Sequence, residues 1–237
     1  MYFNGFHERH EIACGHAAAE MQSASEGRVA CGGAAEDTAA SPLETRMSIL
    51  VLGLLLFLGT HSIRIVADGW RTARVARLGE NRWKGLYSLA SALGLGLIVW
   101  GYGLARAEPL ALWAPPAWTR HVAALLTLPA FVLIAAAYVP GSRIKAAIGH
   151  PMVAGVKVWA IAHLLSNGNL ADVVLFGAFL LWAVLDFRSA RRRDRAAGVT
   201  YRPGTAARDG FVIAAGTGVW ALFAGFLPLW LIGVRPY

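Results

Sequence analysis

Residues 150–193, HPMVAGVKVWAIAHLLSNGNLADVVLFGAFLLWAVLDFRSARRR, contain two apolar segments separated by the turn sequence SNGN, and the second segment ends at a run of arginines. An apolar segment of about 17–25 residues is long enough to cross the hydrocarbon core of a bilayer as a helix. A turn rich in Asn and Gly joins two such helices closely. The stretch therefore predicts a tight hairpin of two membrane-spanning helices, 151–167 and 170–188.

Four further segments of the same kind lie on either side of this hairpin, at 48–66, 86–105, 120–139 and 211–233. We therefore expect an all-α, polytopic integral membrane helical bundle of about six transmembrane helices. The composition agrees, because 57% of the chain is hydrophobic and soluble domains have roughly 45–50% apolar residues. Glycines in the second span favour close helix packing in lipid; they include Gly94, Gly96, Gly101 and Gly103.

Lysine and arginine are distributed unequally between the predicted loops. Fifteen of them follow the first, third and fifth spans, whereas three lie on the other side, namely Arg106, Arg120 and Arg235. The positive-inside rule then places the arginine-rich loops in the cytoplasm and both termini on the outer side of the membrane, which in a bacterium is the periplasmic side of the inner membrane. These loops explain the net charge of +8, so we expect membrane lipid around the protein and no nucleic-acid partner.

Residues 1–46 differ in composition from the rest of the chain. They carry a net charge of −4, against +12 for residues 47–237, and they contain both cysteines, Cys14 and Cys31. They lack the basic and apolar regions of a signal peptide. We expect 1–46 to be a disordered extension or the product of a mis-assigned start, and 47–237 to be the transmembrane domain. Without cysteine, that domain has no thiolate metal ligand.

Ionisable residues inside predicted spans are costly and are candidates for function. By depth, His61 can lie level with His150 near the cytoplasmic side, and His121 can lie level with His163 near the outer side. A haem iron takes axial ligands from two faces, which facing helices can supply, so both pairs are candidate ligand pairs. Other roles stay open: His121 as a solvated end residue, His150 as a cap before Pro151, and interhelical hydrogen bonds.

Lys157 lies seven residues after His150, close to the same helix face. An ammonium group in the middle of a span calls for an anionic partner, and Asp186, a haem propionate and an anionic substrate all remain open. Asp172 begins the predicted span 170–188, where a carboxylate favours the helix N-terminus, so we interpret it as a cap. No serine-nucleophile, HExxH, P-loop or dinucleotide-binding motif is present, and no catalytic residue is assigned.

Several stretches resemble the NnrU family of bacterial membrane proteins: HSIR at 61–64, GENRWKGLYSLAS at 79–91, IVWGYG at 98–103, and the long stretch 138–193. The resemblance covers nearly all of 47–237. It implies an integral membrane protein linked to denitrification, in the metabolism of nitric oxide and nitrite.

The same segments resemble 15-cis-zeta-carotene isomerase, a membrane enzyme that binds haem b through histidines and rotates a carotenoid double bond. The matching positions are His61-Ser62, His150-Pro151, Trp159, Ala162-His163 and Gly168-Asn169. The resemblance implies haem b ligated by His61 and His150, with His163 nearby; Lys157 would then balance the acidic groups of the cofactor. A switch to a thiolate ligand cannot occur in a domain without cysteine.

The His150-Pro151 step is also similar to that of membrane isoprenylcysteine carboxyl methyltransferases. Four functions follow for testing: a haem b protein of nitric oxide and nitrite metabolism, an isomerase of an apolar polyene, a non-catalytic assembly factor for a respiratory or nitrogen-oxide reductase, and a membrane methyltransferase. The sequence leaves open whether the protein is an enzyme.

Overall fold

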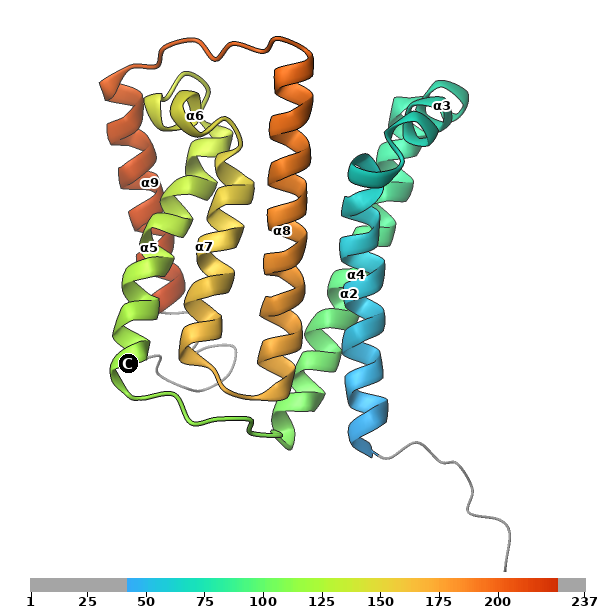
Figure 1. Cartoon of the computed structure of the whole chain (residues 1–237), viewed down its shortest axis with the longest axis vertical. Helices are drawn as coiled ribbons and strands as arrows, with labels where there is room; N and C mark the ends of the chain where they lie inside the picture. The colour runs from blue at the N-terminus through green and yellow to red at the C-terminus, as the bar shows by residue number, and fades with distance from the viewer. Residues whose placement is uncertain (1–41, 226–237) are drawn as a thin grey trace, which may run out of the picture. The chain divides into compact units, whose positions relative to one another are not determined.

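The structure, a computed structural model, describes residues 42–225, which lie in one compact unit (Figure 1). These residues form helices and no β-sheet, which confirms the all-α prediction for this part of the chain. The helices are α2 (Pro42–Val66), α3 (Asp68–Leu78), α4 (Glu80–Ala107), α5 (Trp118–Tyr138), α6 (Arg143–Ile148), α7 (Pro151–Ser166), α8 (Leu170–Ala196) and α9 (Ala206–Gly225).

Within residues 42–225, four helices are long and apolar enough to cross a membrane: Thr45–Val66 within α2, and the whole of α4, α5 and α8. Membrane-spanning helices are thus supported, but the predicted count of six is not confirmed. The helix α7 is apolar but has only 16 residues. The predicted span 211–233 overlaps α9, and its last residues lie outside the described range.

The first helix begins earlier than predicted. The expected boundary at Met47 falls inside α2, which starts at Pro42, where proline suits the first turn of a helix. Arg46 belongs to this helix and forms an ion pair with Glu108 at 2.8 Å. This hydrogen-bonded pairing lowers the pKa of Glu108. The prediction for 1–46 otherwise concerns residues 1–41, which lie outside the described residues.

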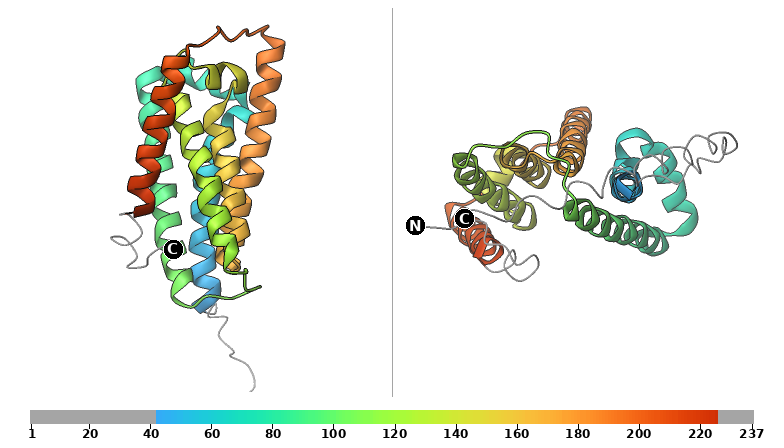
Figure 2. Two further views of the ribbon diagram at one scale, coloured as in Figure 1. Left: turned by 90° about the vertical axis from the view of Figure 1, so that its left-hand side faces the viewer. Right: turned by 90° about the horizontal axis from the view of Figure 1, so that it is seen from below.

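The helices pack in a row rather than around one centre. Viewed along their axes, the order is α9, α5, α7, α8, α2 and α4, as the right-hand view of Figure 2 shows. Successive long helices run in opposite directions (Figure 1). At one end of the long helices lie α3, α6 and the loop 197–205; we call it the arginine-rich end. At the other end of the same helices lie the loops 108–117 and 167–169, and we call it the opposite end.

Glycines allow the backbones of α2 and α4 to approach closely. A Cβ atom on Gly101 would lie 2.5 Å from the backbone nitrogen of Leu50, and one on Gly94 would lie 2.7 Å from that of Phe57. Gly96 and Gly103 have open space instead. Of the four glycines that favoured close packing, two therefore form the contact, because only Gly94 and Gly101 lie on the face of α4 that meets α2.

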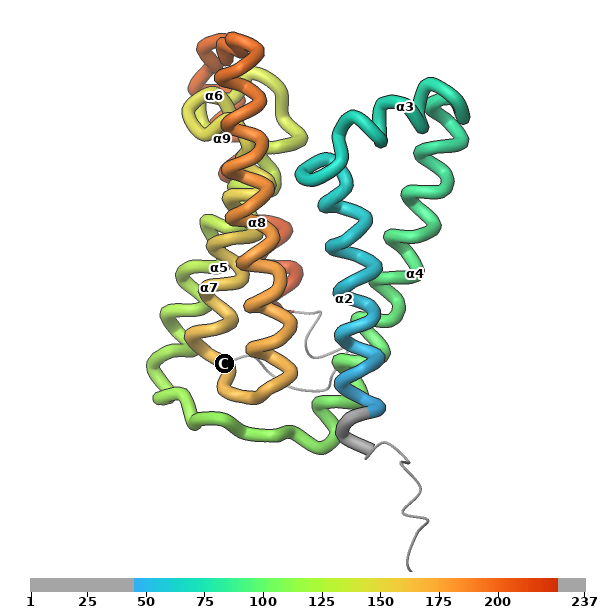
Figure 3. Tube along the Cα trace, turned by 45° about the vertical axis from the view of Figure 1, so that its right-hand side comes forward, coloured from blue at the N-terminus to red at the C-terminus, as the bar shows by residue number. Residues whose placement is uncertain are grey.

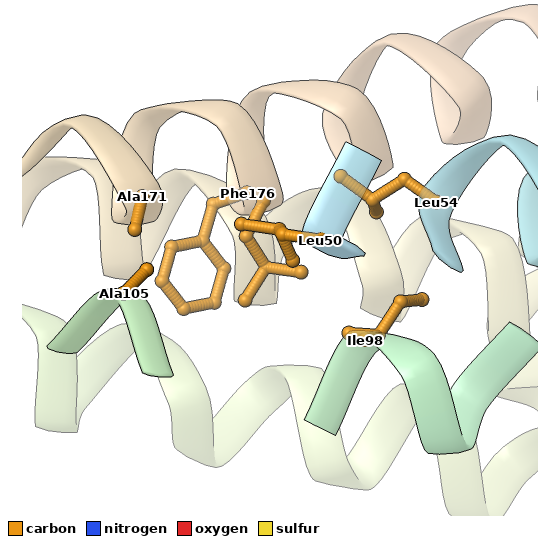
Figure 4. Packing of buried hydrophobic residues seen from close by; sticks show 7 residues of the cluster. Leu50, Leu54, Ile98, Ala105, Ala171 and Phe176 are labelled. Carbon is orange, nitrogen blue, oxygen red and sulfur yellow. The ribbon is translucent and has the colours of Figure 1, made fainter. Parts of the chain in front are cut away.

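Apolar side chains join this pair of helices to α8. Leu50 and Leu54 from α2 meet Ile98 from α4 and Phe176 from α8 in a buried cluster (Figure 4). Many apolar side chains on the outward faces are exposed, such as Leu181 at 63%. Exposed leucine is the expected surface of helices that lie in lipid.

Candidate functional site

His61 lies where α2, α4 and α8 meet. Its Nδ1 lies 2.8 Å from the carbonyl oxygen of Phe57, one turn earlier in α2. Its ring centroid is 4.3 Å from that of Phe57, 5.3 Å from that of Tyr87 on α4 and 6.0 Å from that of Trp182 on α8. We call His61, Tyr87, Ser91 and Trp182 the His61 junction.

Two half-buried residues of this junction each have a buried polar atom without a hydrogen-bond partner in the described structure. They are Trp182, through its indole Nε1, and Ser91, through its hydroxyl. Ser91 is placed at the level of His61, because it precedes Gly94 by one turn on the face of α4 that packs against α2. Buried polar groups without a hydrogen-bond partner are rare in folded proteins, and a bound ligand is one explanation for them. The junction therefore has free hydrogen-bonding capacity beside a histidine.

His150 belongs to a different cluster, at the arginine-rich end. Its Nε2 is 2.7 Å from Oδ2 of Asp194, and the hydroxyl of Tyr201 donates to the same oxygen at 2.6 Å. Partial burial and this hydrogen bond raise the pKa of Tyr201 to about 12. His150 is the residue before α7, as expected for a residue at a helix start, but its side chain makes no capping bond to the helix.

Lys157 and His150 share one aromatic neighbour, Phe187 of α8. The Lys157 ammonium lies 3.6 Å from the centre of that ring, and the His150 ring lies 6.3 Å from it. The two residues therefore do lie on the same side of α7. Among the described residues, Lys157 has no carboxylate partner. Asp186 was one expected partner, but the ammonium lies over the ring of the next residue, Phe187, instead.

The structure does not bring His61 and His150 together. Within residues 42–225, α2 and α7 make no close backbone approach, and each packs against α8, which lies between them. No group of three or more metal-ligating side chains is present in that range. Each histidine keeps one ring nitrogen for a ligand, because the carbonyl of Phe57 engages Nδ1 of His61 and the carboxylate of Asp194 engages Nε2 of His150. Ligation by the pair stays a prediction.

His163 lies in a third cluster, near the opposite end. Its ring stacks on Phe176 with centroids 4.4 Å apart and planes 8° apart, and Trp159 meets it edge-on at 5.2 Å. His121, its expected partner at the same depth, is exposed and shares no hydrogen bond or ring contact with it in the described structure. His163 is therefore enclosed by aromatic rings of α7 and α8.

Asp172 is buried near His163, with 3% of its surface exposed. Tyr102 of α4 donates to its Oδ1 at 2.5 Å, and Asn169 donates to its Oδ2 at 3.0 Å. The carboxylate lies in the first turn of α8, as predicted, but it also links α4 to α8. We call Tyr102, Asn169 and Asp172 the Asp172 clasp.

An apolar cavity of about 410 Å³ opens between α2 and α8. Its α2 side consists mainly of Val51, Leu55, Leu58 and Ser62, which recur at helical spacing next to the face that carries His61. Trp182 lines the cavity and also contacts His61. The indole thus separates the His61 junction from the cavity.

Sequence reasoning did not single out Tyr87, Ser91, Trp182, Asp194 or Tyr201. The sequence does contain a signal for Tyr87 and Ser91, because they lie at helical spacing from Gly94 and Gly101. Residues at this spacing share one face of a helix. Asp194 and Tyr201 carry no such signal, because only the fold brings them to His150.

No curated protein and no solved structure matches the chain. A family model described as NnrU protein matches residues 49–236. The match covers α2 to α9 apart from the first residues of α2, and it includes all three clusters described above. The chain therefore belongs to the NnrU family.

Proposed function

We propose that the protein binds haem b within the membrane through His61 and takes part in the metabolism of nitric oxide and nitrite during denitrification. Its membership of the NnrU family supports the metabolic role. In the proposed orientation the membrane is the bacterial inner membrane, and the arginine-rich end faces the cytoplasm, as the positive-inside rule favours.

The observation that carries the haem proposal is the hydrogen bond of the His61 ring, which decides which ring nitrogen carries the proton. The carbonyl oxygen of Phe57 can only accept a hydrogen bond, so Nδ1 of the neutral ring must carry the proton and Nε2 keeps its lone pair. Histidines that bind metals in proteins usually donate their other ring nitrogen in this way. His61 is thus held in the tautomer that an iron ligand requires.

Haem, when bound, supplies a ferrous iron that takes diatomic ligands such as nitric oxide. The residues of the His61 junction would hold and shield the group. The indole of Trp182 and the hydroxyl of Ser91 offer donors to its acceptor atoms. The rings of Phe57 and Tyr87 would cover part of the histidine.

The test is an optical spectrum of the purified full-length protein, oxidised and reduced with dithionite, beside three variants. His61→Ala is expected to lose the reduced b-type bands. The matched control is His121→Ala, which removes an exposed histidine and is expected to keep them. His150→Ala asks whether a second histidine ligates the iron, and an altered spectrum would support the pair.

A colourless wild-type protein, even after reconstitution with haem, would reject the proposal. Loss of the bands in His121→Ala as well as in His61→Ala would also count against a specific role for His61.

A second candidate function is isomerisation of an apolar polyene, and the cavity between α2 and α8 favours it. The cavity is lined by apolar side chains and is open to the surface of the helices, as entry from the lipid requires. Co-expression with poly-cis carotenoid precursors in the dark tests this candidate. An unchanged isomer ratio, compared with cells that lack the protein, would exclude it for those substrates.

A further inference from the structure

The helix α3 lies across the arginine-rich ends of α2 and α4 rather than along them (Figure 3). It has 11 residues, and none of them is buried. A helix with no buried residue gains little from packing against its own chain, so its sequence is free to suit another surface. In the proposed orientation that surface is the boundary between the cytoplasm and the lipid headgroups.

The exposed side of α3 carries tryptophan and arginine together. Trp70 is 49% exposed, and the guanidinium of Arg74 lies 5.2 Å from the centre of its ring. Trp83, at the start of α4, meets Trp70 edge-on at 5.9 Å. Val66, two residues before the helix, is 81% exposed. Tryptophan is enriched at the headgroup level of membranes, where its ring is partly apolar and its N–H is wet.

Two arginines of α3 have no hydrogen-bonding or ionic partner among residues 42–225. In the described structure, Arg74 and Arg77 form no ion pair or hydrogen bond, although both are exposed. Two other arginines at the same end are engaged, since Arg193 donates to Ser189 and Arg208 donates to the carbonyl of Pro140. The positive charge of α3 is therefore free for an external anion.

We propose that Trp70, Arg74, Arg77 and Trp83, the α3 patch, bind the phosphate headgroups of anionic glycerophospholipids. The charge is complementary, because guanidinium groups bind phosphate oxygens with strong hydrogen bonds. Basic residues beside a membrane are attracted to anionic lipid, and each contributes about a fivefold gain in affinity. The tryptophan pair fixes the depth of the helix at the headgroups, which places both arginines at the phosphates.

The test uses the purified full-length protein in a neutral detergent, with native mass spectrometry to count bound dioleoyl phosphatidylglycerol and dioleoyl phosphatidylcholine. Wild type is expected to retain phosphatidylglycerol in preference. The double variant Arg74→Gln/Arg77→Gln is expected to weaken that binding about thirtyfold. Arg74→Lys/Arg77→Lys keeps the charge and is expected to keep most of the binding.

The matched control is Arg192→Gln/Arg195→Gln, which removes the same charge from exposed positions at the end of α8. It is expected to bind phosphatidylglycerol as wild type does. Thermal unfolding of each variant shows that it is folded. Equal loss in both double glutamine variants, or no lipid preference in wild type, would overturn the proposal. So would binding of polyglutamate, but not of phosphatidylglycerol, through Arg74 and Arg77, because the patch would then fit an acidic protein.

Discussion

Two polar clusters lie among the apolar helices, and they differ in how fully their hydrogen-bonding groups are paired. In the Asp172 clasp, both carboxylate oxygens accept hydrogen bonds, one from Tyr102 and one from Asn169. In the His61 junction, the indole of Trp182 and the hydroxyl of Ser91 are buried without a partner. Both clusters involve α4 and α8, and the His61 junction also includes α2, which carries the histidine.

The difference separates stability from binding. A buried network whose members are all paired holds its helices in one arrangement. A buried donor without a partner costs about 1–3 kcal/mol, so a protein that keeps two of them beside a histidine gains something else. The clasp therefore adds to the apolar contacts that join α4 to α8, and the junction is where a ligand is expected.

The largest expected effect comes from the helix contact on which the junction depends. Gly101→Leu places side-chain atoms where the backbone of Leu50 now lies. Overpacking of this kind is expected to destabilise the protein by about 3 kcal/mol or more. Gly103→Leu is the control, because a Cβ atom there meets open space. Thermal unfolding in detergent should show a large loss for the first variant and almost none for the second. Equal effects would mean that α2 and α4 do not approach through Gly101.

The next effect tests whether the clasp is structural. Asp172→Ala leaves the buried donors of Tyr102 and Asn169 without an acceptor and is expected to destabilise the protein by about 2–3 kcal/mol. Tyr102→Phe removes one hydrogen bond to the carboxylate and is expected to cost about 1.5 kcal/mol. Both are measured by unfolding in detergent. Neither variant should change the haem spectrum at low temperature; a lost spectrum with unchanged stability would reverse the roles of the two clusters.

The sequence predicted the long helices well, because length and hydropathy are local properties. The expected span 120–139 is α5, Trp118–Tyr138, and the turn around Gly168 joins α7 to α8 as expected. The helix α3 was missed, because its arginines were interpreted only as a cytoplasmic loop. The sequence nevertheless contains signals for both ends of this helix, namely Asp68 in the first turn, Arg77 in the last turn and Gly79 after it.

The partners of the polar residues could not be predicted in the same way. The sequence gives a residue's depth and helix face, but it does not say which helix is its neighbour. Because α8 lies between α2 and α7, two histidines of similar depth do not face each other. Lys157 shows the same limit, since it lies over Phe187 rather than beside Asp186, and one step along a helix turns a side chain by about 100°.

The smallest expected effect compares two tryptophans inside the helices. Trp220 donates its indole N–H to Thr127 at 3.1 Å, whereas the indole N–H of Trp182 has no partner. Trp182→Phe and Trp220→Phe remove the same atoms, so the loss of size is common to both. Only Trp220→Phe also loses a hydrogen bond, which leaves the Thr127 hydroxyl with its bond to the carbonyl oxygen of Ala124 alone. Trp220→Phe should therefore be less stable than Trp182→Phe by about 1 kcal/mol in the absence of ligand. The difference should vanish when haem is bound, because Trp182→Phe then also loses one hydrogen bond, the one from its indole to the group. Unfolding of the apo and haem-loaded protein measures both differences. If Trp182→Phe is as destabilising as Trp220→Phe in the apo protein, the indole of Trp182 already has a partner, and the contrast between the two clusters fails at the junction.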